Sequence, residues 1–383
     1  MVLGRRLIAL ISCSALLVLH SDPALATPQP RSEEWWFDAW EIEEKVWPLT
    51  RGRGIVVAVI DTGVEASLPD LEGAVLHGYE YGGTQNGDGR RDHDKEHGGH
   101  GTAMAALIAG QGRGTGMMGV APDSRILPIS EPKFNYADTI RYAVDHGAKV
   151  ISISSSTPAA RCPIAIQRSV TYALQHDVVI VAAAGNDGNL TTSINAPANC
   201  PGVLGAGAVD SNLKIWSKTT PGDNVMLAAP GVSVGSIGKD GTFSWKNNGT
   251  SQATALTSGV IALMRSRFPR MPARQVVQRL IATAKDVGPE GWDERAGYGA
   301  LIPYLALTAD VPADAPNPVY DRLERLSPGG LASPSRSPST SSEKSRTTGL
   351  EKSSSWIWSG IIMLTAIVVG LGFYGLRRMK ARG

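Results

Sequence analysis

The chain has 383 residues, and 42% of them are hydrophobic, which is enough to bury a full α/β core and to carry further segments. A formal net charge of +2 gives no indication of a nucleic-acid-binding protein, so no nucleic acid is expected among its partners. The 43 glycines and 24 prolines predict many tight turns and an irregular tail.

Residues 1–26 have the pattern of a secretory signal peptide. A pair of arginines precedes an apolar run over residues 7–19, and Ala24-Leu25-Ala26 supplies a small-x-small cleavage site. We therefore expect the rest of the chain to be exported. Cys13 lies in a stretch that faintly resembles a lipoprotein acylation site, but the apolar run before it is short, so lipidation is the less favoured alternative.

Residues 27–53 form a short arm that is rich in tryptophan. Four of its apolar residues would share one face of a helix: Trp40, Ile42, Val46 and Trp47. Because the arm is too short to bury a core of its own, we expect this face to pack on a domain surface.

Residues 54–308 alternate apolar strands with helices, a pattern that predicts an α/β domain with a parallel sheet flanked by helices. Residues 55–60 are a continuous β-branched run that ends in Asp61, as in an interior strand that is apolar on both faces. Further strands are expected at residues 149–154, 178–184, 203–209 and 225–229, and helices at 103–110, 137–146, 164–176, after 251, and at 273–284.

The composition changes beyond this domain. Residues 309–355 are rich in Pro and Ser and predict a disordered linker. Residues 356–376 are uncharged, apolar and about long enough to span a bilayer, and the tail at 377–383 is basic. By the positive-inside rule the C-terminus is cytoplasmic, so we expect a single-pass protein of the cell membrane with its globular part outside. A buried core helix is the alternative for residues 356–376.

Four polar residues stand where a predicted strand ends or a helix begins: Asp61, His100, Asn186 and Ser251. The carboxyl ends of parallel strands meet at one edge of a sheet, so these side chains can gather there. They are the parts of acyl transfer, with Ser251 as nucleophile, His100 as general base and then acid, and Asp61 orienting the imidazole. Asn186 would donate to the oxyanion. Each residue alone also fits a turn or a helix cap, so the combination carries the prediction.

The stretches VVAVIDTGV, GHGTAMAALIAG, VVIVAAAGNDG and NGTSQATALTSGVIALM resemble the signature blocks of the subtilisin-like serine proteases, in the same Asp-His-Ser order. The resemblance covers residues 54–305. It implies a serine endopeptidase without a cofactor, with Asp61, His100 and Ser251 as the triad and Asn186 in the oxyanion hole. It further implies two substrate-binding segments, which contain Ser152, Ser154, Ser155, Ser156, Ala182, Ala183, Ala184 and Gly185.

The order of segments resembles a narrower group, the mycosins, which are membrane-anchored subtilisin-like proteases of actinobacterial type VII secretion. The shared features are a signal peptide, a short arm, a Pro-rich linker and one C-terminal membrane helix. This resemblance implies a protein or peptide substrate and partners among the type VII secretion membrane components. The arm leaves no room for a folded inhibitory prodomain.

Signal cleavage would leave two cysteines, Cys162 and Cys200. In an exported chain such a pair is expected to join, which would stabilise the fold by about 3–4 kcal/mol. Two separate buried thiols are the alternative. The resemblance favours the bond, because the two positions fall where mycosins carry a disulfide.

Three positions depart from the family pattern. Ser156 stands where the substrate-binding strand usually has glycine, so its side chain would narrow the specificity. Residues 111–116 match a calcium loop but contain an arginine, so no calcium is expected although Asp70 survives from that site. Gln252 follows the nucleophile where many relatives have a methionine of similar volume.

His93, Asp94, His97 and His100 have spacings that could also gather a metal ion. A ligated His100 could not act as a base, so zinc is disfavoured, and the other two histidines are expected to be loop residues that make activity sensitive to pH. A structural subunit of a secretion complex, with dispensable or autoinhibited proteolysis, is the main alternative function, supported by the Trp-rich arm. A secreted nutritional protease is disfavoured by the predicted tether.

Overall fold

The structure is a computed structural model of the chain that describes residues 28–81, 87–131, 135–188, 190 and 195–326. The predicted signal peptide (1–26), transmembrane segment (356–376) and basic tail (377–383) lie outside these residues. Within the described ranges, the structure contains no helix that is both long enough and apolar enough to cross a membrane.

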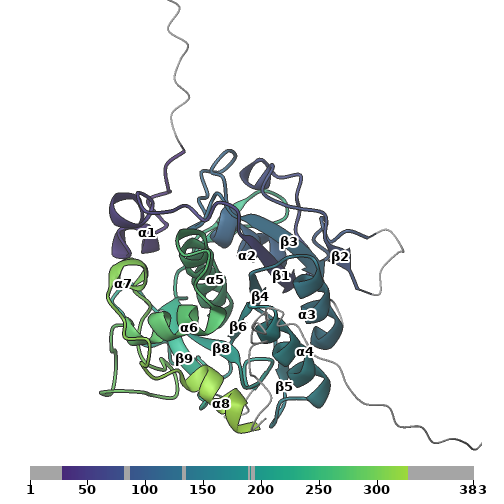
Figure 1. Cartoon of the computed structure of the whole chain (residues 1–383). Coiled ribbons are helices and arrows are strands. Elements are labelled where there is room, and N and C mark those ends of the chain that lie inside the picture. Colours follow the sequence, from purple (N-terminus) through teal and green to yellow (C-terminus); the bar gives the residue numbers. More distant parts are fainter. Residues whose placement is uncertain (1–27, 82–86, 132–134, 189, 191–194, 327–383) are drawn as a thin grey trace, which may run out of the picture. The chain divides into compact units, whose positions relative to one another are not determined.

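A seven-stranded parallel sheet forms the centre of the described part of the chain, in the order β2-β3-β1-β4-β6-β8-β9 (Figure 1). Its strands are β1 (Val56–Asp61), β2 (Tyr79–Glu80), β3 (Arg125–Ser130), β4 (Val150–Ile153), β6 (Val179–Ala183), β8 (Val203–Val209) and β9 (Val225–Pro230). Two antiparallel ribbons join β5 (Thr157–Pro158) to β7 (Asn195–Ala196) and β10 (Ser236–Ile237) to β11 (Phe243–Ser244). The predicted α/β class with a parallel sheet is confirmed.

Helices cover both faces of the sheet because alternate strand residues point to opposite sides. In β1, Val57 and Val59 belong to one apolar cluster, and Ala58 and Ile60 belong to the other. The first cluster includes α2 (His100–Ala109), α5 (Thr250–Arg267) and α6 (Ala273–Ala282), and the second includes α3 (Tyr136–Asp145) and α4 (Ile164–Gln175).

The helix α5 is buried along almost its whole length, from Thr250 to Arg265. Small residues allow it to approach its neighbours closely. A Cβ built at Gly259 would lie 2.2 Å from Cγ2 of Val120, so a larger residue there would have to displace the Val120 side chain. The buried helix gives a rigid support to the residues of its first turn, which include Ser251.

The strand β3 was missing from the sequence analysis. Pro128 interrupts its apolar run, and proline is uncommon inside sheets because it lacks an N–H group. The strand nevertheless pairs with β1 over six residue positions, from Val56 with Arg125 to Asp61 with Ser130. Its other neighbour, β2, pairs only beyond the proline, at Ile129 and Ser130.

The arm packs against the domain through its aromatic residues, although it is not one continuous helix. It forms α1 (Trp36–Ala39) and a π-helical turn, η1 (Ile42–Val46), separated by a left-handed residue at Glu41. Five apolar side chains of the arm are buried: Trp36, Phe37, Trp40, Ile42 and Val46. Trp47 donates its indole N–H to the carbonyl of Val120 at 2.9 Å.

A 3-10 turn, η2 (Pro69–Leu71), lies between β1 and β2, and two helices follow α6: α7 (Pro303–Thr308) and α8 (Pro318–Leu326). Helix α8 corrects the prediction of a disordered linker (309–355) at residues 318–326, whereas residues 327–355 lie outside the described part of the chain. Val319, Tyr320 and Leu323 are buried on one side of the helix, and Arg274 of α6 pairs with two of its carboxylates. The Pro- and Ser-rich composition of the longer segment concealed this short amphipathic stretch.

Candidate active site

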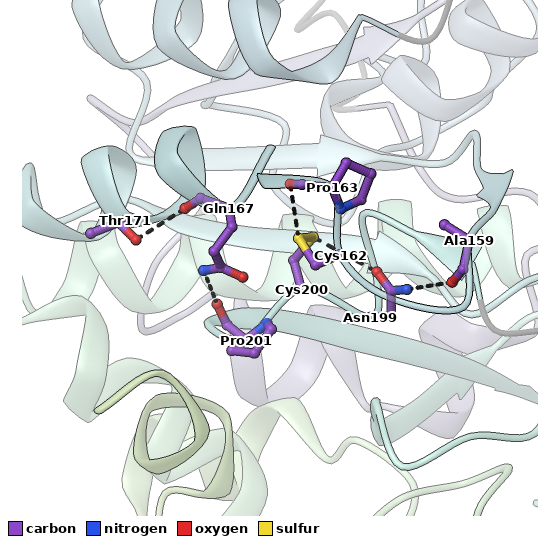
Figure 2. The surroundings of a disulfide bond; sticks show 8 residues. All are labelled: Ala159, Cys162, Pro163, Gln167, Thr171, Asn199, Cys200 and Pro201. Carbon is purple, nitrogen blue, oxygen red and sulfur yellow. Dashed lines mark hydrogen bonds between the residues drawn. A yellow bond between two sulfur atoms is a disulfide. The ribbon is translucent and has the colours of Figure 1, made fainter. Parts of the chain in front are cut away.

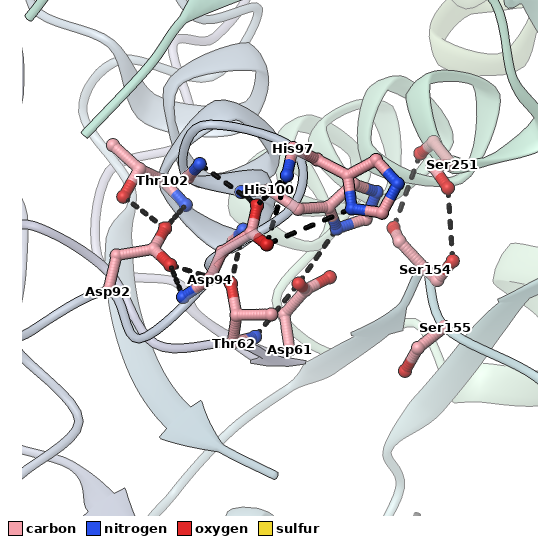
Figure 3. Close-up of polar contacts among 12 residues, drawn as sticks. Asp61, Thr62, Asp92, Asp94, His97, His100, Thr102, Ser154, Ser155 and Ser251 are labelled. Carbon is pink, nitrogen blue, oxygen red and sulfur yellow. Dashed lines mark hydrogen bonds and ion pairs between the residues drawn. The ribbon is translucent and has the colours of Figure 1, made fainter. Parts of the chain in front are cut away.

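The pair Asp61 and His100 joins the end of β1 to the start of α2. The His100 Nδ1 atom lies 2.8 Å from Asp61 Oδ1, and Asp61 is buried (Figure 3). Gly101 makes this approach possible, because a Cβ at its position would lie 2.1 Å from the carbonyl oxygen of Gly63. The carboxylate therefore orients the imidazole with Nδ1 toward the protein and leaves Nε2 to face a substrate.

The Ser251 hydroxyl lies in the first turn of α5 and donates a hydrogen bond to the carbonyl oxygen of Ser154 at 3.0 Å. Ser154 returns a hydrogen bond from its own hydroxyl to the carbonyl of Ser251 at 3.3 Å (Figure 3). In the described structure no hydrogen bond joins Ser251 to His100. A hydroxyl has one proton, so Ser251 must release Ser154 before it can donate to the imidazole.

The side chain of Asn186 is oriented by Thr250. Its Oδ1 atom accepts hydrogen bonds from the backbone N–H and the hydroxyl of Thr250, both at 2.9 Å. The Nδ2 group consequently remains to donate elsewhere, beside Ser251 in the same cleft. This is the chemistry that an oxyanion donor needs.

A cleft of about 740 Å³ brings together Asp61, His100, Asn186 and Ser251. Of the predicted substrate-binding residues, Ser154, Ser155 and Ser156 line it. Ser152 lies buried in β4, and residues 182–185 are buried and are not among the residues that line the cleft. Alanines 182 and 183 are interior residues of β6, so packing between strands covers them.

One wall of the cleft is the charged loop at residues 93–97. Burial is the largest single influence on the pKa of His100 and lowers it, but the charge and hydrogen bond of Asp61 act in the opposite direction. Asp94 and Asp92 add further negative charge, and the pKa of His100 ends above its ordinary value. The imidazole is therefore a somewhat stronger base than a free histidine side chain.

The loop histidines do not form a metal site with Asp94. The Asp94 carboxylate accepts backbone N–H bonds from Glu96, His97, Gly99 and His100, which hold its pKa well below the ordinary range despite burial. His93 faces Glu80, with 3.5 Å between its Nε2 and the carboxylate. Among the described residues, no group of three or more His, Cys, Asp or Glu side chains is arranged to hold a metal ion.

The surroundings of Asp70 do not fit a calcium ion. Both carboxylate oxygens accept backbone N–H bonds, from Gly114 at 3.1 Å and from Thr115 at 2.8 and 3.1 Å. Calcium requires oxygen ligands, whereas this loop presents hydrogen-bond donors to the carboxylate. Backbone donors thus occupy the positions from which a cation would bind.

A disulfide joins Cys162, just before α4, to Cys200, just after β7 (Figure 2). It lies beside the ribbon of β5 and β7, and β5 begins directly after Ser156. Asn199 reinforces the connection by donating to the carbonyl of Ala159 at 2.7 Å. The disulfide therefore fixes the segment that runs from Ser156 in the cleft to Cys162. Of the two alternatives for the cysteines, the structure has the disulfide and not two separate thiols.

Sequence reasoning missed two residues of the site: Thr250 and Glu131. Thr250 precedes the nucleophile and had no pattern of its own. Glu131 lines the cleft and donates its backbone N–H to the carbonyl of Asp61 at 2.7 Å. It follows β3, so recognition of that strand would have placed it at the same sheet edge as Asp61.

Comparison with known proteins shows which family the chain belongs to. The chain matches the subtilase family (peptidase S8) over residues 52–299. The chain belongs to this family. The predicted resemblance to subtilisin-like serine proteases is therefore confirmed, and the matched residues include Asp61, His100, Asn186 and Ser251.

Mycosins are among the relatives of this subtilase. It is 36% identical to mycosin-4 of Mycobacterium tuberculosis over 321 residues, which cover 70% of this chain and 68% of mycosin-4. Fervidolysin of Fervidobacterium pennivorans is 32% identical over 73% of this chain, and this chain spans 44% of its length.

Solved mycosin structures share the fold of this subtilase. The MycP3 protease from the type VII (ESX-3) secretion system superimposes with a TM-score of 0.63 at 35% identity, covering 74% of this chain and 89% of MycP3. MycP1 with its N-terminal propeptide removed gives a TM-score of 0.64 at 31% identity, over 73% of this chain and 98% of MycP1.

Proposed function

We propose that the protein is a serine endopeptidase that hydrolyses peptide bonds through an acyl-enzyme on Ser251. The observation that carries this proposal is the hydrogen-bonded pair of Asp61 and His100, which opens into the same cleft as Ser251 and the Asn186 amide. Membership of the subtilase family supports the same chemistry.

In the proposed reaction, Ser251 gives its proton to Nε2 of His100 as its oxygen bonds to the peptide carbonyl carbon. Asp61 stabilises the imidazolium that forms, and the Nδ2 group of Asn186 donates to the oxyanion. His100 then protonates the departing amine as the carbon–nitrogen bond breaks. Water repeats the sequence on the ester, which releases the acid and restores Ser251.

Labelling with a fluorophosphonate probe tests this proposal. The full-length protein is expected to react at Ser251, and Ser251→Ala should lose the label. Ser258→Ala is the matched control, because Ser258 lies in the same helix and is buried away from the cleft, with its hydroxyl on the carbonyl of Thr254. Equal labelling of the Ser251→Ala variant and the wild type would refute the assignment.

We further propose a narrow substrate specificity. Ser156 lines the same cleft as Ser251, and a serine side chain there takes up more space than glycine would. The neighbouring Ser155 is held by a hydrogen bond from the Tyr136 hydroxyl at 3.1 Å, which supports a rigid wall. Ser156→Gly is expected to broaden the range of peptides cleaved. Efficient digestion of casein by the unaltered protein would contradict the proposal.

A location on the outer face of the cell membrane, beside a type VII secretion complex, is proposed from the apolar segment at 356–376 and from the mycosin relatives. Deleting residues 356–383 is expected to move the protein from the membrane fraction into the medium. Retention of the truncated protein in the membrane would argue against a C-terminal anchor.

The alternative of a structural subunit was supported by the Trp-rich arm, and two tryptophans of that arm are buried. Trp36 and Trp40 of the arm are 0% and 5% exposed, so they pack on their own domain instead of offering a surface to a partner. Replacing Ser251 by Ala in cells separates the two roles. Normal secretion by this variant, together with loss of secretion on deletion of the whole protein, would favour the structural role.

A further inference from the structure

The buried residue Asp92 makes four hydrogen bonds although it does not line the cleft. Its Oδ1 accepts from the Thr62 hydroxyl at 2.8 Å and from the backbone N–H of Asp94 at 3.0 Å. Its Oδ2 accepts from the backbone N–H of Thr102 at 2.9 Å and from the Thr102 hydroxyl at 2.5 Å. Asp92 is 6% exposed, so these donors replace water around its charge.

Two of the residues that donate these hydrogen bonds lie next to the Asp61–His100 pair in the sequence. Thr62 is the residue after Asp61, and Thr102 is two residues after His100. Asp92 therefore binds the end of β1 and the first turn of α2 at once (Figure 3).

The two threonine hydroxyls also receive hydrogen bonds, and this sets the direction of their own protons. Gly101 donates its N–H to the Thr62 hydroxyl at 3.0 Å, and Glu65 donates its N–H to the Thr102 hydroxyl at 3.0 Å. Each threonine proton is then directed to Asp92. Loss of the carboxylate would leave both hydroxyls without their acceptor in a buried place, which is costly.

We propose that Asp92 is a positioning residue, which locks β1 to α2 through Thr62 and Thr102 and so sets the hydrogen bond between Asp61 and His100. This inference rests on the proposed peptidase function of the same site. It concerns the geometry of the pair, which can be measured whether or not the protein cleaves a peptide.

The Asp92 charge gives the proposal a second consequence. Together with Asp94, its negative charge favours the imidazolium form of His100 and contributes to the raised pKa of that side chain. The Lys239 ammonium group contacts the carbonyl of Asp92 at 3.5 Å and also that of Asp94. Several titratable and charged groups surround His100 in the described structure. Asp61 comes from β1, Lys239 from the β10–β11 turn, and Glu131 lies beyond β3. The loop before α2 supplies the others: Asp92, His93, Asp94, Lys95, Glu96 and His97.

The test compares Asp92→Asn with the wild type in the full-length protein. Two quantities are measured: the rate of fluorophosphonate labelling, and the pKa of His100 from NMR of histidine-labelled protein, with the signal assigned by its loss in His100→Gln. We expect labelling to slow by about 10- to 100-fold, as a misplaced catalytic group does, and the pKa of His100 to fall. Unchanged labelling and an unchanged His100 pKa in folded Asp92→Asn would overturn the proposal.

Asp70→Asn is the matched control. Asp70 is also a buried carboxylate that accepts backbone N–H bonds, but it lies outside the cleft lining. The Asp70→Asn variant is expected to have a lower melting temperature than the wild type and an unchanged pKa of His100. An equal fall of that pKa in both variants would show a general loss of stability and would count against positioning by Asp92.

Thr102 provides a second route if Asp92→Asn does not fold. Thr102→Val removes the hydroxyl at nearly constant volume, and Thr102→Ser keeps it. The proposal expects slower labelling in the valine variant and recovery in the serine variant, whereas equal rates in the two would overturn it. A wild-type protein that shows the His100 titration but takes up no label would instead refute the peptidase function, since the NMR measurement does not depend on activity.

Discussion

Thr250 donates two hydrogen bonds to the Oδ1 atom of Asn186, each 2.9 Å long. The same hydroxyl accepts the backbone N–H of Gly185 at 3.1 Å, so Thr250 connects the start of α5 to the loop after β6. The orientation of the Asn186 amide is thus decided by the residue that precedes the nucleophile.

Replacing Asn186 by Ala is expected to lower kcat by about 100- to 1000-fold with little change in KM, because the lost donor acts on the oxyanion of the transition state. Thr250→Val should lower kcat less, and Thr250→Ser should retain most of it because the hydroxyl remains. Steady-state kinetics on a peptide substrate measure all three. A rise in KM at constant kcat would show that Asn186 binds the ground state instead.

Activity is expected to rise with pH as His100 loses its proton, with the midpoint above the ordinary histidine value because Asp61, Asp94 and Asp92 raise the pKa of His100. The contribution of His100 to the free energy of unfolding changes with pH in the opposite direction to activity. A histidine with a raised folded pKa contributes stability below its unfolded pKa, and this contribution is lost as the pH rises through the folded pKa.

The pH dependence of kcat/KM measures the activity limb, and Asp61→Asn is the informative variant. We expect its midpoint to fall and its kcat to drop by about 10⁴-fold, as loss of the orienting carboxylate does in related triads. An acid limb at the same pH in both proteins would mean that another group titrates there.

The arm contains a buried carboxylate that makes stability depend on pH. Burial raises the pKa of Glu34 to about 8, although it accepts backbone N–H bonds from Arg31 and Met118. Between the unfolded value near 4.5 and about 8, the folded protein holds a proton that the unfolded chain has lost. The free energy of unfolding should therefore fall as the pH rises through this window, by roughly 2 kcal/mol from pH 6 to 8.

Urea unfolding at pH 6 and pH 8 checks this prediction with Glu34→Gln, which should have the smaller pH dependence because glutamine does not ionise. Glu33→Gln is the control, since Glu33 is adjacent and solvent-accessible. Parallel pH dependences in the wild type and in Glu34→Gln would contradict the assignment.

Replacing both Cys162 and Cys200 by Ser is expected to lower the free energy of unfolding by about 4 kcal/mol in the chain-entropy picture, given their separation of 38 residues. Thermal unfolding with and without a reducing agent gives the comparison. If reduction lowers the melting temperature of the double variant as much as that of the wild type, the effect does not come from this bond.

Removal of calcium is expected to leave the melting temperature unchanged, because backbone N–H groups already satisfy the Asp70 carboxylate. Thermal unfolding with and without a chelator tests this. A fall that is reversed by added calcium would reveal a cation site and would contradict the prediction.

Local patterns were enough to predict the principal chemistry of the site. Asp61 ends an apolar run, and His100, Asn186 and Ser251 stand beside predicted strands or helices, so their gathering at one sheet edge follows from parallel topology alone. The alternation of strands and helices likewise gave the α/β class. These features depend on residues that are close together in the chain.

Features that depend on contacts between distant parts of the chain could not be predicted from local sequence patterns. Strand β3 forms despite Pro128 because it pairs with β1. Helix α8 forms within a segment of linker-like composition because one of its faces is buried against the domain. The side chains that orient the catalytic groups, Thr250 and Asp92, have no pattern in the sequence.

The sequence by itself determined which residues are candidates for the proposed reaction, because nucleophile, base and oxyanion donor must be particular chemical groups beside strand ends. Only the tertiary structure decided how they are oriented: the Ser251 hydroxyl on the carbonyl of Ser154, the Asn186 amide turned by Thr250, and β1 bound to α2 through Asp92. Orientation depends on hydrogen bonds between segments 30 or more residues apart in several cases, and no local pattern encodes such a partner.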